Sequence, residues 1–267
     1  RTCFLLTVLP MTSVLHRLLG VGCLALLLTA CAASDGAGFS SSALEPENVL
    51  TIGAGSGEPV AAAFVPSPAA PADYVIATST VQADPADVMR GEETQITGFL
   101  ARNKGWDGVI CLPGTHTKWV HVSADEVISF QTFMTGELFN TIATQTVLRH
   151  SIAAEGWDDS AFISGLETAI ARPERLAARL FSLRAQGLLN GMQGNTARAH
   201  LSGLLIGAEL AGAKPYWLGQ QIAVIGDSGL SKLYVTALAT QSAPATQVNA
   251  TAITLAGLMT AYQRLKG

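Results

Sequence analysis

Apolar positions in the middle of the chain change from short runs to alternation and back. Residues 109–112 (VICL) are an apolar run, residues 118–122 (KWVHV) alternate, and residues 127–130 (VISF) are again mainly apolar. Alternation with period two is typical of a half-buried strand. Tight turns at 113–116 and 123–125 separate the three segments. The pattern therefore predicts a three-stranded antiparallel meander.

The pattern after the meander is mainly helical. Thr135 is expected to be the N-cap of the next helix, and Glu137 lies in its first turn, where the helix dipole favours a negative charge. The remaining expected elements are helices over 157–190 (with a new start at Pro173), 197–211, 230–239 and 252–265, and strands over 222–225 and 246–249. The helix over 197–211 is apolar enough to be buried. A meander followed by alternating helices and strands indicates an α/β fold.

The segments before the meander are less regular. An acidic start that contains proline, at residues 84–87, predicts a helix over 88–100, and residues 105–108 predict a turn. Residues 58–80 contain several prolines, which block regular structure. We expect a loop or linker there, with one short strand at 74–78.

The amino-acid composition indicates a domain boundary near residue 83 and argues against a nucleic-acid partner. Apolar residues make up 49% of the chain and charged residues 13%, which suits a globular protein with a sizeable core. The net charge is −4 and no basic stripe occurs, so a nucleic-acid partner is not expected. Residues 1–83 hold two of the 16 basic side chains, so the composition changes near residue 83.

The first 31 residues allow two interpretations. The apolar run at 18–28 is too short to span a bilayer, and residues 28–31 (LTAC) resemble a lipobox in which Cys31 would be lipidated. A GC-rich gene translated out of frame also produces runs of Ala, Leu, Ser and Gly. The four cysteines fit neither a zinc site nor a disulfide framework, and Cys111, in an apolar run, is expected to be a buried thiol.

Three segments could carry chemistry. In residues 90–95 (RGEETQ), a carboxylate at a helix start could act as a general base or hold Mg²⁺, or it could simply be a solvated cap. In residues 112–119 (LPGTHTKW), the Gly114 amide and the Thr115 hydroxyl could donate to a phosphate, with added charge from Lys118; the alternative is an ordinary hairpin turn.

A third segment, residues 222–229 (IAVIGDSG), predicts a strand, a turn of small residues and a helix. This geometry can support a nucleotide near helix amides, although a plain strand–helix connection has the same pattern.

Taken in order, these segments are far more specific than any one of them. The chain resembles the 2-dehydro-3-deoxygalactonokinase family over residues 84–267. The matching segments are DVMRGEETQ (87–95), LPGTHTKWV (112–120), TFMTGELF (132–139), HS (150–151), LLIGAEL (204–210) and TLAGL (254–258).

The resemblance implies a fold, a reaction and a location. The fold is the actin-like ATPase (ribonuclease H-like) fold of two-lobe sugar kinases, with a nucleotide cleft between the lobes. The reaction is transfer of the ATP γ-phosphate to the 6-hydroxyl of 2-dehydro-3-deoxy-D-galactonate, with Mg²⁺, in galactonate catabolism. The implied partners are ATP and a small sugar acid, with homodimerisation left open. A cytoplasmic location is implied, with membrane attachment through Cys31 as the alternative.

Residue roles are implied by position. Gly114 and Thr115 would contact the β- and γ-phosphates, helped by Lys118. Gly226 and Asp227 would form the adenosine-binding turn.

By analogy within the superfamily, Glu92 would be the base and a Mg²⁺ ligand, with Glu93 as the second candidate for the base. The substrate carboxylate would meet a cation, for which Arg90, Lys118 and Arg149 are the candidates.

One family feature is missing from the sequence. The family opens with an Asp-Trp-Gly-Thr-Thr phosphate loop, and no tryptophan of this chain directly follows an aspartate. We therefore expect a first lobe that is truncated or disrupted. Residues 1–83 would be an atypical, poorly structured segment, 84–108 a remnant of the first lobe, and 109–267 the complete nucleotide-binding lobe. The alternatives are a lipid-anchored ligand-binding protein and a catalytically inactive nucleotide-binding relic.

Overall fold

The computed structural model describes residues 6–8, 49–52, 60–66, 74–82 and 84–266 of the 267-residue chain. It divides into two compact units. Unit 1 comprises Arg1–Arg102 and Thr254–Gly267, and unit 2 comprises Asn103–Ile253. The apolar run at 18–28 and Cys31 lie outside the described residues, so the lipobox stays a prediction.

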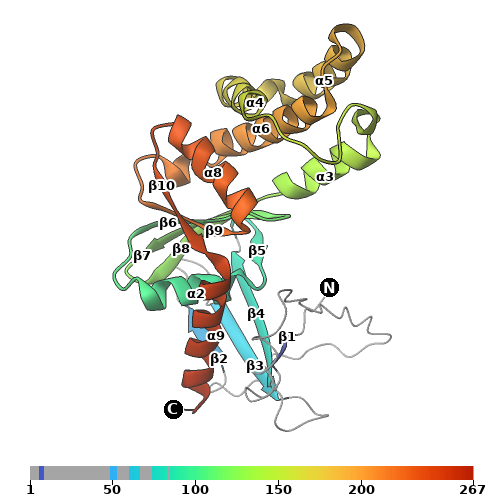
Figure 1. The fold of residues 1–267 in the computed structure, drawn as a ribbon. Coiled ribbons are helices and arrows are strands. Elements are labelled where there is room, and N and C mark those ends of the chain that lie inside the picture. Colours follow the sequence, from blue (N-terminus) through green and yellow to red (C-terminus); the bar gives the residue numbers. More distant parts are fainter. Residues whose placement is uncertain (1–5, 9–48, 53–59, 67–73, 83, 267) are drawn as a thin grey trace. The chain divides into compact units, whose positions relative to one another are not determined.

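Unit 2 is built on a five-stranded mixed sheet (Figure 1). Its strand order is β10 (Ala245–Asn249), β9 (Ile222–Gly226), β6 (Gly108–Leu112), β7 (Thr117–Ser123) and β8 (Glu126–Phe133). The strands β10, β9 and β6 are parallel to one another, and β6, β7 and β8 form an antiparallel meander. The predicted meander and both predicted later strands are confirmed.

The prediction that β7 is half-buried is wrong. Residues Thr117, Lys118, Trp119 and Val120 are each at most 4% exposed, so both faces of the first half of this strand are covered. Strand β7 lies between β6 and β8 in the sheet, and its alternating sequence does not reveal that the polar face is covered as well. As a consequence, the Lys118 side chain is buried.

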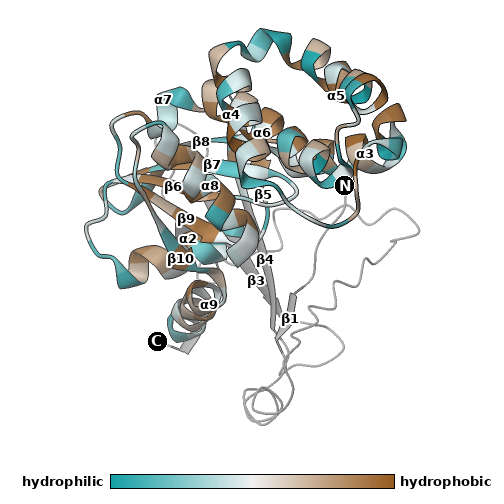
Figure 2. Cartoon of the chain, turned by 45° about the horizontal axis from the view of Figure 1, so that its top comes forward, coloured by the Kyte–Doolittle hydropathy of each residue, from teal (hydrophilic) through white to brown (hydrophobic). Residues whose placement is uncertain are grey.

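Helices cover unit 2 and confirm the predicted helical regions. They are α3 (Thr135–Gln145), η3 (Val147–His150), α4 (Asp159–Ala171), η4 (Pro173–Arg175), α5 (Leu176–Asn190), α6 (Gly194–Gly212), α7 (Lys214–Trp217) and α8 (Ser228–Thr240). The expected N-cap of α3 is wrong: Met134 occupies the cap without a side-chain hydrogen bond, and Thr135 is the first helical residue. The buried helix predicted over 197–211 is α6, whose hydrophobic residues, brown in Figure 2, include several that belong to the core.

Glycines let α4 and α6 approach each other closely. A Cβ on Gly203 would overlap the carbonyl oxygen of Phe162, and one on Gly207 would overlap that of Leu166. Gly165 on α4 faces the carbonyl oxygen of His200 in the same way. Side chains at these positions would force the two helices apart, so the glycines set their distance.

Unit 1 contains a sheet in a region predicted to lack regular structure. The strands β1 (Leu6–Val8), β4 (Tyr74–Gln82), β3 (Val60–Pro66) and β2 (Val49–Ile52) lie in that order, and β5 (Asp87–Met89) also pairs with β4. The expectation of a proline-blocked loop over 58–80 is wrong for β3, because its only proline is its last residue, where no further ladder bond is needed. The short strand expected at 74–78 is part of the longer β4.

Among the described residues of unit 1, helices are formed by α2 (Glu92–Arg102) and by most of α9 (Ala250–Lys266). The predicted helix over 88–100 began too early. Met89 is 1% exposed and pairs with Thr80 in β5, and Gly91 has a φ of 103°, which an α-helix does not allow. Among the helices in the described part of the chain, none is both long and apolar enough to cross a membrane.

Candidate functional site

Two predicted nucleotide-binding turns follow neighbouring parallel strands. Strand β6 leads into the loop 113–116, and β9 leads into Gly226 and Asp227. Because β6 and β9 pair in parallel, both turns leave the sheet at the same edge. The carboxyl edge of parallel strands is where α/β folds bind ligands.

The two turns are in contact. A Cβ on Gly226 would lie 2.9 Å from the carbonyl oxygen of Pro113 and 3.0 Å from the hydroxyl oxygen of Ser231. Glycine at this position therefore allows the backbone of one turn to touch the other. The structure brings Gly226 and Asp227 beside the start of the loop that carries Gly114 and Thr115.

The loop 113–116 also lies on the first turn of α3. A Cβ on Gly136 would overlap the carbonyl oxygen of Gly114, and the Glu137 amide donates to the carbonyl oxygen of Thr115 at 2.9 Å. Since Thr115 is exposed and the α3 N-terminus has no side-chain cap, the loop and the positive end of the helix dipole form a surface suited to an anion.

The carboxylate of Asp227 already has a structural role. Its Oδ1 accepts hydrogen bonds from the Gly229 amide at 2.9 Å and the Leu230 amide at 3.3 Å, so it caps α8. This cap fixes the turn that begins at Gly226. A role of Asp227 in holding adenosine stays a prediction.

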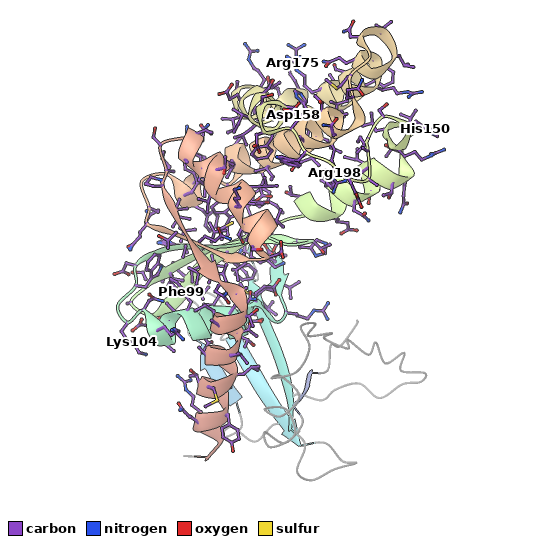
Figure 3. The ribbon with its side chains drawn as sticks, in the orientation of Figure 1. Phe99, Lys104, His150, Asp158, Arg175 and Arg198 are labelled. Atoms are coloured by element: carbon purple, nitrogen blue, oxygen red, sulfur yellow. The ribbon has the colours of Figure 1, made fainter. Side chains whose placement is uncertain are left out.

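Two of the predicted cations, Lys118 and Arg149, do not have their side chains at this edge. Lys118 lies in β7 at 4% exposure, and strand alternation directs its side chain away from the face that Thr117 and Trp119 share. Arg149 is exposed in η3, beyond the far end of α3, whose 11 residues span about 16 Å. Its neighbour His150, labelled in Figure 3, lies in the helical part of unit 2.

The predicted acidic pair lies at the start of α2 in unit 1. Glu92 Oε2 accepts from the Arg90 amide at 2.9 Å, and Glu93 Oε2 accepts from the Gly91 amide at 2.7 Å. Both glutamates thus satisfy backbone donors at a helix start, as caps do.

The two glutamates differ in their exposure to solvent. Glu92 is half-buried, whereas Glu93 is 2% exposed and its Oε1 has no hydrogen-bond partner among the described residues. Loss of solvation raises the pKa of Glu93, against the hydrogen bonds that lower it. Glu93 is therefore not a simple solvated cap.

Behind the 113–116 loop lies a buried polar cluster that sequence reasoning missed. We call it the Glu209 cluster; it consists of Thr117, Trp119, Thr135, Glu209 and Tyr234. The Trp119 indole donates to Glu209 Oε1 at 2.8 Å, and the Tyr234 hydroxyl donates to Oε2 at 2.7 Å. The hydroxyls of Thr117 and Thr135 also hydrogen-bond to the carboxylate, and Thr117 Oγ1 lies 2.9 Å from the Tyr234 hydroxyl.

Burial dominates the electrostatics of this cluster. Glu209 is 3% exposed, and desolvation raises its pKa from 4.5 to about 7 although four side-chain hydrogen bonds oppose the shift. Burial also raises the pKa of Tyr234 and of the Cys111 thiol, which confirms Cys111 as a buried thiol. The available signal in the sequence was a lone acidic residue in an otherwise apolar helix.

Comparison with known proteins agrees with the predicted family. A family model described as 2-keto-3-deoxy-galactonokinase matches residues 53–261, which begins ahead of the predicted start at residue 84. The chain belongs to this family.

Members of the 2-keto-3-deoxy-galactonokinase family include two curated relatives. The chain is 42% identical over 185 residues to a Rhizobium meliloti protein provisionally named 2-dehydro-3-deoxygalactonokinase, covering 67% of this chain and 60% of the relative. It is 34% identical over 166 residues to the 2-dehydro-3-deoxygalactonokinase of Escherichia coli, covering 62% of this chain and 56% of the relative. The chain thus matches 56–60% of the length of these relatives.

A solved structure has a similar fold. The crystal structure of a Sinorhizobium meliloti protein, provisionally assigned as a 2-dehydro-3-deoxygalactonokinase, is 38% identical with a TM-score of 0.71. The match covers 76% of this chain and 69% of that protein. The mixed α/β arrangement of sheet and helices is therefore shared with the family.

Proposed function

We propose that this chain phosphorylates 2-dehydro-3-deoxy-D-galactonate at its 6-hydroxyl with ATP as donor, as the names of its relatives suggest. The observation that carries the proposal is the contact between the 113–116 loop, the first turn of α3 and the Gly226 turn at one sheet edge. Phosphoryl transfer depends mainly on positioning and charge neutralisation, and this edge offers backbone and hydroxyl donors in a fixed arrangement.

In this proposal, Gly114 and Thr115 bind the β- and γ-phosphates through their amides and the Thr115 hydroxyl. Glycine at 114 leaves the backbone accessible, since a Cβ there would come no closer than 3.8 Å to any neighbouring heavy atom. Gly226 and Asp227 contact the adenosine, and Lys118 contributes positive charge from within the sheet. The fold assigned with this function is actin-like, and the location is cytoplasmic.

Glu92 is the proposed base for the substrate hydroxyl, with Glu93 as the second candidate. The partial exposure of Glu92 leaves it open to a substrate, whereas the unpartnered oxygen of Glu93 is enclosed. Of the predicted cations Arg90, Lys118 and Arg149, Lys118 is buried, so Arg90 and Arg149 are the proposed ligands for the substrate carboxylate. Of these, Arg90 is exposed and lies two residues from Glu92.

Mg²⁺ fits the donors that the chain offers. Mg²⁺ in kinases is usually held by one or two carboxylates, water and the nucleotide phosphates. The described residues contain no cluster of three or more acidic, histidine or cysteine side chains able to hold a metal, and Glu92 supplies a single accessible carboxylate. Bound Mg²⁺ would neutralise phosphate charge, and Glu92 would be its protein ligand.

The test is a coupled assay with ATP, Mg²⁺ and 2-dehydro-3-deoxy-D-galactonate. We expect turnover in the wild type, a kcat lower by about 10²–10⁴-fold in Glu92→Gln, and ATP binding unchanged in that variant. The exposed Glu155→Gln is the matched control. Binding of ATP without turnover, unaltered by Glu92→Gln, would instead support a catalytically inactive nucleotide-binding protein.

A further inference from the structure

The Glu209 cluster joins the segments that surround the 113–116 loop. Thr117 directly follows this loop at the start of β7, and Thr135 directly precedes Gly136, whose position touches Gly114. Tyr234 lies on α8, one turn after Ser231, which neighbours Gly226. One carboxylate on α6 therefore connects β7, α3 and α8 at the points where each reaches the candidate site.

The donors around Glu209 are all neutral. The titratable groups that face it are Tyr234 on α8 and Cys111 on β6, and Lys118 points to the other face of β7. An ionised carboxylate accepts hydrogen bonds on both oxygens and can accept from the indole, the phenol and the two threonine hydroxyls at once. A protonated carboxyl donates through its own hydrogen and accepts hydrogen bonds more weakly, so it holds these donors less firmly than the carboxylate does.

We propose that Glu209 is a positioning residue whose ionised carboxylate holds Thr117 and Thr135, and through them the register of the 113–116 loop on the first turn of α3. This inference rests on the proposed kinase function. Glu209 is buried behind the loop and acts through the two threonines without contacting substrate. Its effect is therefore expected on the phosphate donor and not on the binding of the sugar acid.

The register that Glu209 maintains is visible in one backbone hydrogen bond. The amide of Glu137 in α3 donates to the carbonyl oxygen of Thr115 at 2.9 Å. If the threonine anchors are released, this bond opens more often and its amide exchanges faster with solvent. Amide exchange thus reports on the positioning directly, without any need for turnover.

The experiment compares Glu209→Gln, Thr135→Val and Thr135→Ser with the wild type and with Glu155→Gln as control. Valine keeps the shape of threonine and removes the hydroxyl, whereas serine keeps the hydroxyl. For Glu209→Gln and Thr135→Val, we expect the KM for ATP to rise about tenfold, the KM for the sugar acid to stay within twofold, and the Glu137 amide to exchange about tenfold faster. Thr135→Ser should restore both values to within about twofold of the wild type.

Different results overturn the two proposals. Suppose that the wild type is active and that Glu209→Gln and Thr135→Val are folded. If both variants then keep the wild-type KM for ATP and the wild-type exchange rate of the Glu137 amide, the positioning role is refuted. If the wild type shows no turnover, the proposed function fails, and the exchange rates alone decide on Glu209. Should Glu209→Gln not fold, Thr135→Val and its serine counterpart decide the question.

Discussion

The stability of this protein should depend on pH through one buried carboxylate. Glu209 lies 3% exposed among four neutral donors, and its pKa is raised from 4.5 to about 7. Glu209→Gln keeps the size and shape of the protonated carboxyl and removes its ionisation. Comparing this variant with the wild type therefore isolates the effect of charging a single buried group.

The expected magnitude follows from the pKa difference. A carboxyl pKa raised from 4.5 to about 7 corresponds to about 3 kcal/mol between the folded and unfolded states. The folded state holds the proton more tightly, so the contribution is fully present below pH 4.5 and is lost as the pH rises to about 7. Between pH 5 and 8 the wild type should lose about 2–3 kcal/mol relative to Glu209→Gln.

Other titrating groups should cancel in this comparison. The pKa of Glu93 is also raised by burial, while the pKa of His200 is lowered by burial, and both groups are present in the two proteins. The pKa of the Cys111 thiol is raised well above its usual value and so lies outside the range from pH 5 to 8. The difference between the two curves therefore reports on Glu209.

Urea unfolding at pH 5, 6, 7 and 8 provides the measurement. The free energy of unfolding is obtained from each midpoint and slope, and equal slopes show that both proteins unfold from similar states. The exposed Glu155→Gln should follow the wild-type curve at every pH. Parallel curves for Glu209→Gln and the wild type across this range would refute a raised pKa at Glu209 and with it the account of its environment.

Three further predictions test neighbouring features. Tyr234→Phe removes a donor at 2.7 Å from Glu209, which should cost about 1–3 kcal/mol at pH 8 and less at pH 5, as urea unfolding can measure. Gly203→Ala should lower the free energy of unfolding by about 1–2 kcal/mol, because overlap with the Phe162 carbonyl outweighs the higher helix propensity of alanine. Gly187→Ala, inside α5 with its nearest neighbour at 3.6 Å, is the contrasting case and should not lower it. Gly136→Ala should weaken ATP binding by at least tenfold in calorimetry while the chain stays folded, since its Cβ would displace the Gly114 carbonyl; unchanged affinity would contradict a phosphate role for that loop.

Local patterns were sufficient to predict much of unit 2. Turn residues at 113–116 and 123–125 delimit three strands, and the structure has β6, β7 and β8 at these positions. The turn between β7 and β8 has positive φ values at Ala124 and Asp125, as a tight hairpin requires. What local patterns could not predict is which strands lie beside one another, because β6 pairs with β9 across more than a hundred residues.

The bond between Thr135 and Glu209 could not be predicted either, because it too joins residues that lie far apart in the sequence. Thr135 precedes a glutamate by two residues, so a sequence rule predicts a local cap, yet its hydroxyl bonds to Glu209 on another helix. Glu209 is an acidic residue in an apolar helix. The sequence therefore indicates that it has a hydrogen-bonding partner, but does not show which residue that partner is. The Thr135 hydroxyl could either cap the N-terminus of α3 or hydrogen-bond to the buried Glu209. The bond to Glu209 forms because an unsatisfied buried carboxylate would cost more free energy than an uncapped helix end. The same preference leaves the first turn of α3 uncapped beside the 113–116 loop, where an anion could bind.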